Sequence, residues 1–304
     1  MVIHDKRHLP KILRCGLVAI VGRANVGKST YLNRAIGQKL SITSRKPQTT
    51  RYQVLGVKTS QNLQIVFLDT PGLQPNAGKA LNRSMNQEVQ RALIDVDVAL
   101  MFVEALRFTD TDRYVGDYLQ LAKIPTIVAV NKVDQVKSKE LLLPFLQEVS
   151  VGTAAAEIVP ISALTGDNLD ALEGCLAARL PLGPALFPDD QVTDKSERFL
   201  IAEILREKLI RGLGDELPHS ISVVIEAFEV EQHLVRVSAV IWVERESQKP
   251  LVIGRGGRRL KQIGLRARQD METVLEKQVY LRNWVKVKES WSSDESALKD
   301  LGFE

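Results

Sequence analysis

Residues 22–29, which read Gly-Arg-Ala-Asn-Val-Gly-Lys-Ser, have the types and the spacing of a phosphate-binding loop. They match the pattern GxxxxGK[ST], and they lie between an apolar run and a helical pattern, as this loop requires. Glycines let backbone N–H groups turn toward phosphate oxygens, and the start of the following helix adds positive partial charge. Lys28 is expected to reach the β- and γ-phosphates, and the hydroxyl of Ser29 to bind Mg²⁺. The alternative, a chance glycine turn, leaves the flanking strand and helix unexplained.

A second stretch with suitable chemistry is Asp69-Thr70-Pro71-Gly72, which follows the apolar run 63–68. In a parallel sheet the Asp69 carboxylate would emerge at the carboxyl edge of the strands, where α/β proteins bind ligands. There it can hold Mg²⁺ through water. The backbone N–H of Gly72 can meet a γ-phosphate, which would make the loop sensitive to the presence of that phosphate.

Two further stretches predict which base is bound. Asn131-Lys132-Val133-Asp134 follows the apolar run 125–130, and Ser162-Ala163 follows the run 157–161. The Asp134 carboxylate can accept two hydrogen bonds from guanine, whereas adenine would leave it unsatisfied. Ser162-Ala163 can give a backbone N–H to guanine O6. The expected GTP-binding residues are therefore Gly22, Arg23, Ala24, Asn25, Val26, Gly27, Lys28, Ser29, Thr30, Asp69, Thr70, Pro71, Gly72, Asn131, Lys132, Asp134, Ser162, Ala163 and Leu164.

The elements that position these residues follow from the apolar periodicity of residues 15–180. Short β-rich runs alternate with helical patterns, which predicts an α/β domain with a doubly wound, mostly parallel sheet. Residues 1–14 form an expected N-terminal extension, and four breakers between Pro181 and Pro188 predict a linker over 181–192. The expected strands are 16–21, 63–68, 96–103, 125–130 and 157–161, and the expected helices are 81–93, 139–149 and 168–180.

Residues 193–304 show a different order of elements, which predicts a second, α+β domain. A helical pattern over 196–211 precedes two alternating runs at 220–228 and 234–243, and a glycine turn at 254–257 leads into a helix that ends near 275. A last strand is expected over 279–288. Helices on one face of a three-stranded sheet fit this order.

The glycine turn and its surroundings favour binding of single-stranded RNA. A GxxG loop before a helix lets nucleic acid approach the backbone closely, while flanking cations contact phosphates. Residues 249–288 contain eleven Lys and Arg against three Asp and Glu, whereas residues 189–231 contain five against eleven. Trp284 either stacks on bases or packs in its strand, and Trp291 is left undecided. The expected RNA-binding residues are Ile253, Gly254, Arg255, Gly256, Gly257, Arg258, Arg259, Lys261 and Arg266.

Length and composition agree with this division. The chain has 304 residues and a net charge of +4, which suits two domains and an anionic partner. The two cysteines are far apart and form no CxxC motif, which argues for a reducing compartment and against a zinc framework. Apolar runs are far shorter than the about 20 residues of a membrane helix, so a soluble protein is expected.

The motifs GRANVGKS, DTPG, NKVD and SAL, with SRKPQTTR at 44–51 and the GxxG domain, resemble the Era family of bacterial GTPases along nearly the whole chain. The resemblance implies a P-loop GTPase domain followed by a type II KH domain. It implies binding to the 3′ end of small-subunit ribosomal RNA and action in assembly of that subunit. Thr49 or Thr50 would complete the Mg²⁺ shell beside Ser29 and Asp69, and Thr50 is favoured. A cytoplasmic monomer is implied, with peripheral association at the inner face of the cell membrane left open.

The expected hydrolysis site lacks one familiar group. Ras-like enzymes orient the attacking water with a glutamine directly after the DxxG glycine, and here that position is Leu73. Slow turnover is therefore expected, with Lys28, Asn25, Thr50 and Gly72 as the catalytic set. In related GTPases an asparagine at the place of Asn25 helps to hold K⁺; the alternative is that Asn25 only braces the loop. Gln74 is a weaker candidate for a displaced glutamine.

The preferred hypothesis is a GTP-controlled RNA-binding switch in which residues 44–51 and 69–80 respond to the γ-phosphate. One alternative is a P-loop kinase or ATPase, which does not explain Asn131 and Asp134. Another is a constitutive RNA-binding protein that uses nucleotide only as a structural ligand.

Overall fold

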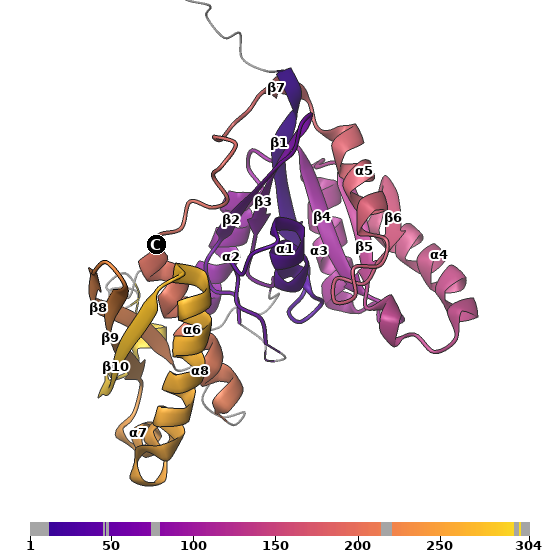
Figure 1. Cartoon of the computed structure of the whole chain (residues 1–304). Helices are drawn as coiled ribbons and strands as arrows, with labels where there is room; N and C mark the ends of the chain where they lie inside the picture. The colour runs from indigo at the N-terminus through magenta and orange to yellow at the C-terminus, as the bar shows by residue number, and fades with distance from the viewer. Residues whose placement is uncertain are drawn as a thin grey trace, which may run out of the picture.

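The structure, a computed structural model, describes residues 12–44, 46, 49–73, 80–213, 221–294 and 298, and all structural statements below concern these residues. They form two lobes, each built on its own sheet (Figure 1). None of the helices described is long and apolar enough to cross a membrane.

The first lobe contains a sheet with the strand order β2-β3-β1-β4-β5-β6. The central strand β1 is parallel to both of its neighbours, β3 and β4. Parallel strands covered on both faces are expected to be almost continuously apolar, and β4 and β5 are buried along nearly their whole length. The bounds are β1 Ile12–Val21, β2 Val54–Thr59, β3 Leu63–Asp69, β4 Val98–Glu104, β5 Thr126–Asn131 and β6 Glu157–Pro160.

Helices cover both faces of this sheet, so the predicted doubly wound architecture is confirmed. On one face, Tyr31 of α1 and Leu172 of α5 pack with Val18 and Phe102. On the other face, helices α2, α3 and α4 pack over the alternate residues of the same strands. The bounds are α1 Lys28–Ile36, α2 Ala80–Ala92, α3 Asp110–Leu121, α4 Leu142–Thr153 and α5 Leu169–Arg179, with 3-10 turns at Val133–Gln135 and Lys139–Leu141.

Four features of this lobe differ from the expectations drawn from the sequence. The edge strand β2 and the helix α3 were not predicted; β2 pairs antiparallel with β3, and Gly56 within it is paired with Phe67. Strand β1 starts at Ile12, inside the expected extension. Within the expected linker, a short strand β7 (Leu182–Pro184) pairs antiparallel with Ile12–Arg14. A proline is tolerated there because β7 is short and lies off the main path of the sheet.

The second lobe has the element order helix, two strands, two helices and a final strand. Its sheet has the order β10-β9-β8, with β10 parallel and β8 antiparallel to β9. The bounds are α6 Glu197–Gly212, β8 Ser222–Val230, β9 Leu234–Val243, α7 Lys249–Ile253, α8 Arg258–Leu275 and β10 Gln278–Val287, with 3-10 turns at Glu246–Gln248, Arg255–Gly257 and Trp291–Ser293. Helix α7, which has five residues, was not predicted.

Alternation along the strands decides which face of this second sheet is the core. Val237 and Ile241 of β9 and Val285 of β10 are buried against Ile204 of α6 and Ile263 of α8. Because side chains on a strand point to alternate faces, the even-numbered residues of β9 and β10 turn away from these helices.

Candidate nucleotide and nucleic-acid sites

The phosphate loop connects β1 to α1, and its conformation depends on glycine at two positions. Gly22 has a φ of 137° and Gly27 a φ of 106°, both in the left-handed region that L side chains avoid. A Cβ at Gly27 would lie 2.1 Å from the amide nitrogen of Asn131. The glycines therefore allow the turn and the close approach of the guanine-side loop.

Lys28 lies folded under this loop. Its Nζ donates to the carbonyl oxygens of Gly22 and Arg23 at 2.9 Å each, and 6% of the residue is exposed. Burial lowers the pKa of Lys28 to about 8, although the nearby Asp69 carboxylate opposes the shift. A bound phosphate would supply the negative charge that a buried ammonium group needs.

Three of the expected Mg²⁺ ligands are adjacent in the structure. The Ser29 hydroxyl donates to Asp69 Oδ2 at 2.8 Å and lies 2.9 Å from the Thr50 hydroxyl. Thr49 instead bonds to Ser44 and to the carbonyl of Lys46. The structure thus places Thr50, rather than Thr49, beside Ser29.

The donor set of this cluster suits Mg²⁺, which prefers oxygen ligands. Asp69 Oδ1 is buried and has no hydrogen-bond partner among the described residues, and burial raises the pKa of this carboxyl. A divalent cation would relieve both features. Ser41, which also donates to Asp69 Oδ2 at 2.8 Å, was missed from the sequence because no motif contains it.

Asn131 holds the guanine-side loops against the phosphate loop. Its amide nitrogen donates to the carbonyl of Val26 at 2.7 Å, and its Oδ1 accepts from the backbone N–H of Ala163 at 2.8 Å. The Ser162 hydroxyl donates to Asp134 Oδ1 at 2.6 Å, while Asp134 stays exposed. The three expected loops therefore form one site, with the Asp134 carboxylate at its open side.

An ion-pair network that the motifs did not reveal connects the same loops. Glu104, at the end of β4, pairs with Arg23 at 2.7 Å through Oε2 and with Lys132 at 3.2 Å through Oε1. Arg23 also pairs with the buried Asp112 at 3.2 Å. Burial raises the pKa of Glu104, but the bonds from Arg23 and Lys132 outweigh it and lower the pKa below its usual value. Only the strand order, which sets β4 between β1 and β5, brings these residues together.

Leu73, the residue directly after the DxxG glycine, packs in the hydrophobic core. Leu73 is 7% exposed and packs with Val89 and Leu93 in the core under α2, so it cannot orient water. Gln74 lies outside the described residues. Asn25 has a φ of 66°, so its backbone adopts the left-handed conformation. Gly72 is tightly placed, because a Cβ there would lie 2.8 Å from the backbone nitrogen of Ala24.

In the second lobe, the glycine turn between α7 and α8 presents bare backbone. Gly254, Gly256 and Gly257 have φ values of 74°, 56° and 73°, and a Cβ on Gly256 or Gly257 would meet no atom within 4 Å. A hollow beside the turn gathers five of the expected RNA-binding residues, namely Gly254, Arg255, Arg258, Arg259 and Arg266, with Gly212, Gln262 and Ile263. Lys261 is exposed, and it and Ile253 do not line this hollow.

The segment between α1 and β2 is held by the second lobe. Arg206 of α6, which is buried, donates to the carbonyl of Thr49, and Arg51 donates to the carbonyl of Ile221 at 2.7 Å. Glu207 of α6 is fully buried and pairs with Lys39. These contacts join residues that lie more than 150 positions apart, and no sequence motif predicts them.

Family models match both parts of the chain. A model described as 50S ribosome-binding GTPase matches residues 17–132, and a KH domain model matches residues 216–292. The GTPase Era of Azotobacter vinelandii is 54% identical over 291 residues, which cover 96% of this chain and 97% of the relative. The GTPase Era of Pseudomonas aeruginosa is 51% identical over 301 residues, covering 99% and 98%.

Two solved structures are similar over nearly the whole chain. A point variant of Aquifex aeolicus Era bound to GDP and AlF4⁻ matches with a TM-score of 0.92 and 40% identity, covering 96% of this chain and 99% of that one. Era in complex with MgGDPNP and nucleotides 1506–1542 of 16S ribosomal RNA matches with the same score, identity and coverage.

Proposed function

Because this chain belongs to the Era family of GTPases, we propose that it is a GTP-hydrolysing switch that binds the 3′ end of small-subunit ribosomal RNA and acts in assembly of the small ribosomal subunit. The observation that carries the proposal is the bond from Arg206 to Thr49. It ties the segment beside the expected Mg²⁺ ligands to the domain that carries the GxxG turn. A change at this segment on GTP binding must therefore change contacts of the RNA-binding domain.

The division of the chain supports this reading. We assign residues 12–180 to the GTPase domain, because β1 begins at Ile12, residues 181–192 to a linker and residues 193–304 to the KH domain. The antiparallel pair of β7 with β1 anchors the start of the linker on the GTPase sheet. The start of the linker is therefore held on the first domain, and the contacts of α6 hold the segment that follows the linker.

In the nucleotide site, Lys28 and the glycine-rich backbone would hold the phosphates, and Asp134 would select guanine. Ser29, Thr50 and Asp69 would hold Mg²⁺, which when bound supplies positive charge to the phosphate oxygens. Leu73 offers no group that orients water, so intrinsic hydrolysis is slow in this proposal. Asn25 would contribute by holding K⁺ at the phosphate loop, and replacement of Na⁺ by K⁺ should then raise the GTPase rate.

RNA binding that depends on the nucleotide is the decisive test. The affinity for an RNA spanning nucleotides 1506–1542 of 16S ribosomal RNA is measured with GDPNP, with GDP and without nucleotide. A switch requires different affinities, because a ligand that does not distinguish two states cannot shift their balance. Equal affinities would leave the nucleotide as a structural ligand only.

Guanine recognition has its own test. Asp134→Asn exchanges a carboxylate that accepts two hydrogen bonds for an amide that can donate, so preference should move from GTP toward xanthosine triphosphate. Competition against a fluorescent nucleotide measures this shift. Unchanged GTP affinity would contradict the assignment and favour a P-loop enzyme of other specificity.

We further propose that the protein is monomeric and acts in the cytoplasm. Sedimentation of the full chain at increasing concentration tests the oligomeric state. Co-sedimentation with anionic lipid vesicles tests the other expectation from the family, peripheral association with the inner face of the cell membrane.

A further inference from the structure

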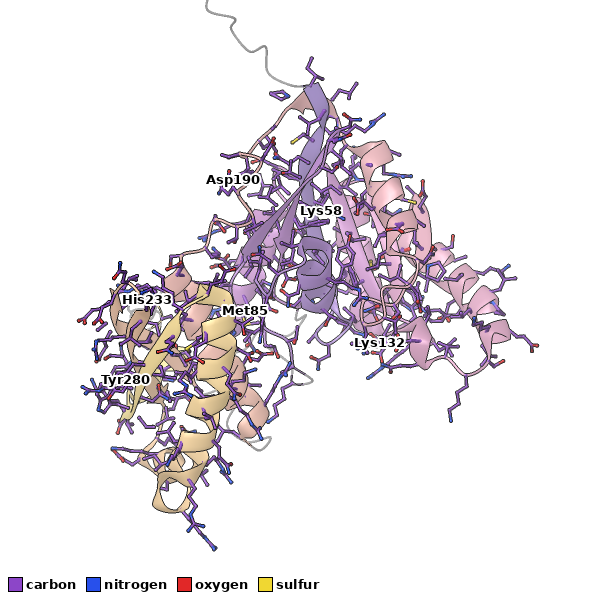
Figure 2. All side chains as sticks on the ribbon, in the orientation of Figure 1. Lys58, Met85, Lys132, Asp190, His233 and Tyr280 are labelled. Atoms are coloured by element: carbon purple, nitrogen blue, oxygen red, sulfur yellow. The ribbon has the colours of Figure 1, made fainter. Side chains whose placement is uncertain are left out.

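The face of the second sheet that turns away from α6 and α8 carries exposed aromatic side chains on its edge strand. On β10, Val279 and Val285 are buried against the helices, whereas the alternate residues Tyr280 and Trp284 are 44% and 42% exposed. Figure 2 shows Tyr280 on the outer side of the second lobe, away from the first lobe. We call the surface formed by Tyr280, Arg282, Trp284 and Lys286 with Arg236 of β9 the β10 face.

Cations surround the aromatic rings of the β10 face. The guanidinium groups of Arg236 and Arg282 lie 5.9 and 5.2 Å from the ring centre of Tyr280, and Arg282 Nε donates to the Tyr280 hydroxyl at 3.2 Å. Residues 277–288 contain four Lys and Arg and no Asp or Glu. The strand itself therefore presents only positive charge between its aromatic rings.

Acidic groups meet this surface from neighbouring elements. Glu226 of β8 pairs with Lys286 at 3.0 Å, and Glu231 pairs with Arg236 at 2.7 Å. All four of these side chains are about half exposed, and exposed pairs of this kind are weak. An incoming phosphate can therefore replace either carboxylate.

A neighbouring part of the same sheet face packs against the first lobe. Trp242 and Val224 pack against Leu81 and Met85 of α2, together with the fully buried Trp291. Figure 2 shows Met85 between the lobes. The lobe contact uses that part of the face, whereas Trp284 and Tyr280 lie outside it.

The spacing of the two exposed rings suits a polynucleotide. Tyr280 and Trp284 are four residues apart on one strand, about 13 Å at the usual rise per residue, with Arg282 between them on the same face. Rings on which successive bases stack, alternating with cations that contact phosphates, are the general form of a single-strand binding surface. Helix α7, which leads into the glycine turn, packs against β10, and β10 is an edge strand of the sheet. RNA that leaves the turn can therefore reach the β10 face around this edge.

We propose that the β10 face is a second contact for single-stranded RNA, in which bases stack on Tyr280 and Trp284 and phosphates contact Arg282 and Lys286. It lies on the side of the sheet opposite to the helices that carry the GxxG hollow. The inference rests on the proposed RNA-binding function and adds a separate segment of RNA to it.

The test compares a long and a short RNA. The long probe spans nucleotides 1506–1542 of 16S ribosomal RNA, and the short probes are fragments of it cut to about four nucleotides, the length that a GxxG groove holds. The double variant Tyr280→Ala with Trp284→Ala should bind the long RNA more weakly by about 5- to 150-fold for each lost stacking contact. For the short fragment that still binds the GxxG turn, the double variant should have the same affinity as the wild type.

Two controls separate stacking from folding. Tyr114→Ala removes a ring of 45% exposure from α3 of the other lobe and should leave affinity for the long RNA unchanged. Trp284→Phe keeps a stacking ring and should retain most of the affinity. Thermal unfolding followed by circular dichroism verifies that each variant is folded.

The outcomes also separate this proposal from the function on which it rests. Gly257→Asp, which places a negative side chain on the open glycine turn, is the reference variant for GxxG binding. If it abolishes binding of both probes while the double variant binds both normally, the β10 face does not bind RNA. A double variant that loses the short fragment as well would show that the surface is not a separate contact. If neither variant affects either probe, both the second contact and the GxxG function are wrong.

Discussion

The ion pair between Lys39 and Glu207 offers a direct test of how the two domains are held together. Lys39 lies between α1 and β2, and Glu207 lies on α6. Lys39→Met removes the ammonium group and keeps most of the apolar stem. Because Glu207 is fully buried, its carboxylate then loses one of the cations that offset the cost of burying it.

The expected magnitude follows from what remains around the carboxylate. Removal of one partner from a buried pair costs about 3–5 kcal/mol when the remaining charge is left alone. Here Arg211 stays at 2.7 Å and Lys208 at 3.8 Å from Glu207, and the Lys39 side chain is 28% exposed. Both facts reduce the loss, so about 1.5–2 kcal/mol is expected, in the range for hydrogen bonds to charged groups.

The reporter for this loss is tryptophan fluorescence. The three tryptophans are Trp242, Trp284 and Trp291, all in the second domain, so urea unfolding followed at this signal reports on that domain. With a slope of about 1–3 kcal/mol per M, Lys39→Met should lower the midpoint by about 0.5–2 M. Lys39→Arg keeps the charge and should recover most of the shift.

Lys58→Met is the matched control, because Lys58 pairs with Glu173 inside the first domain and the two lysines are comparably exposed. It should leave the tryptophan transition in place. If Lys39→Met leaves the midpoint unchanged, or if Lys58→Met lowers it equally, the reasoning that this buried interdomain pair stabilises the second domain is wrong.

The remaining predictions concern other parts of the molecule. Glu104→Gln should speed release of fluorescent GDP about 10-fold, since one charged bond is worth about 1.5 kcal/mol, whereas Glu148→Gln, in an exposed pair, should not change the rate measured in stopped flow. Burial raises the pKa of Asp270, but the bonds from Lys208 and Lys39 outweigh it and hold the pKa below its ordinary 3.8. A carboxyl group with a lowered pKa stabilises the fold above about pH 4, and this stabilisation is lost as the pH falls further. The urea midpoint of the wild type should therefore drop in acid, and that of Asp270→Asn should drop less. Gly257→Asp places a negative side chain where the turn is open and should reduce RNA affinity at least 10-fold while GDP affinity, measured in parallel, is retained. Exchange of Na⁺ for K⁺ should raise phosphate release from GTP, and an equal rate in both salts would remove the role proposed for Asn25.

Several features could be predicted from the sequence because the physics behind them is local. A phosphate loop needs its glycines, lysine and serine within eight residues, and the strand and helix around it are visible as apolar periodicity. The glycine turn at 254–257 and the concentration of cations after Lys249 are equally local. Such patterns were sufficient for the two-domain architecture and for the family.

Other features were decided only by tertiary packing. Thr49 and Thr50 are neighbours of the same type, and only the fold turns Thr50 toward Ser29 and the carbonyl of Thr49 toward Arg206. The pairing of Glu104 with both Arg23 and Lys132 requires the strand order β1-β4-β5, which no short motif encodes.

The tryptophans show the same limit most clearly. Trp284 and Trp291 lie seven residues apart in the sequence, yet one is 42% exposed and the other fully buried. Their difference depends on where α2 of the first domain meets the second sheet, a contact between segments about 200 residues apart. Sequence by itself determined which chemistry the chain can perform, while the packing of one domain on the other decided which side chains are free to take part.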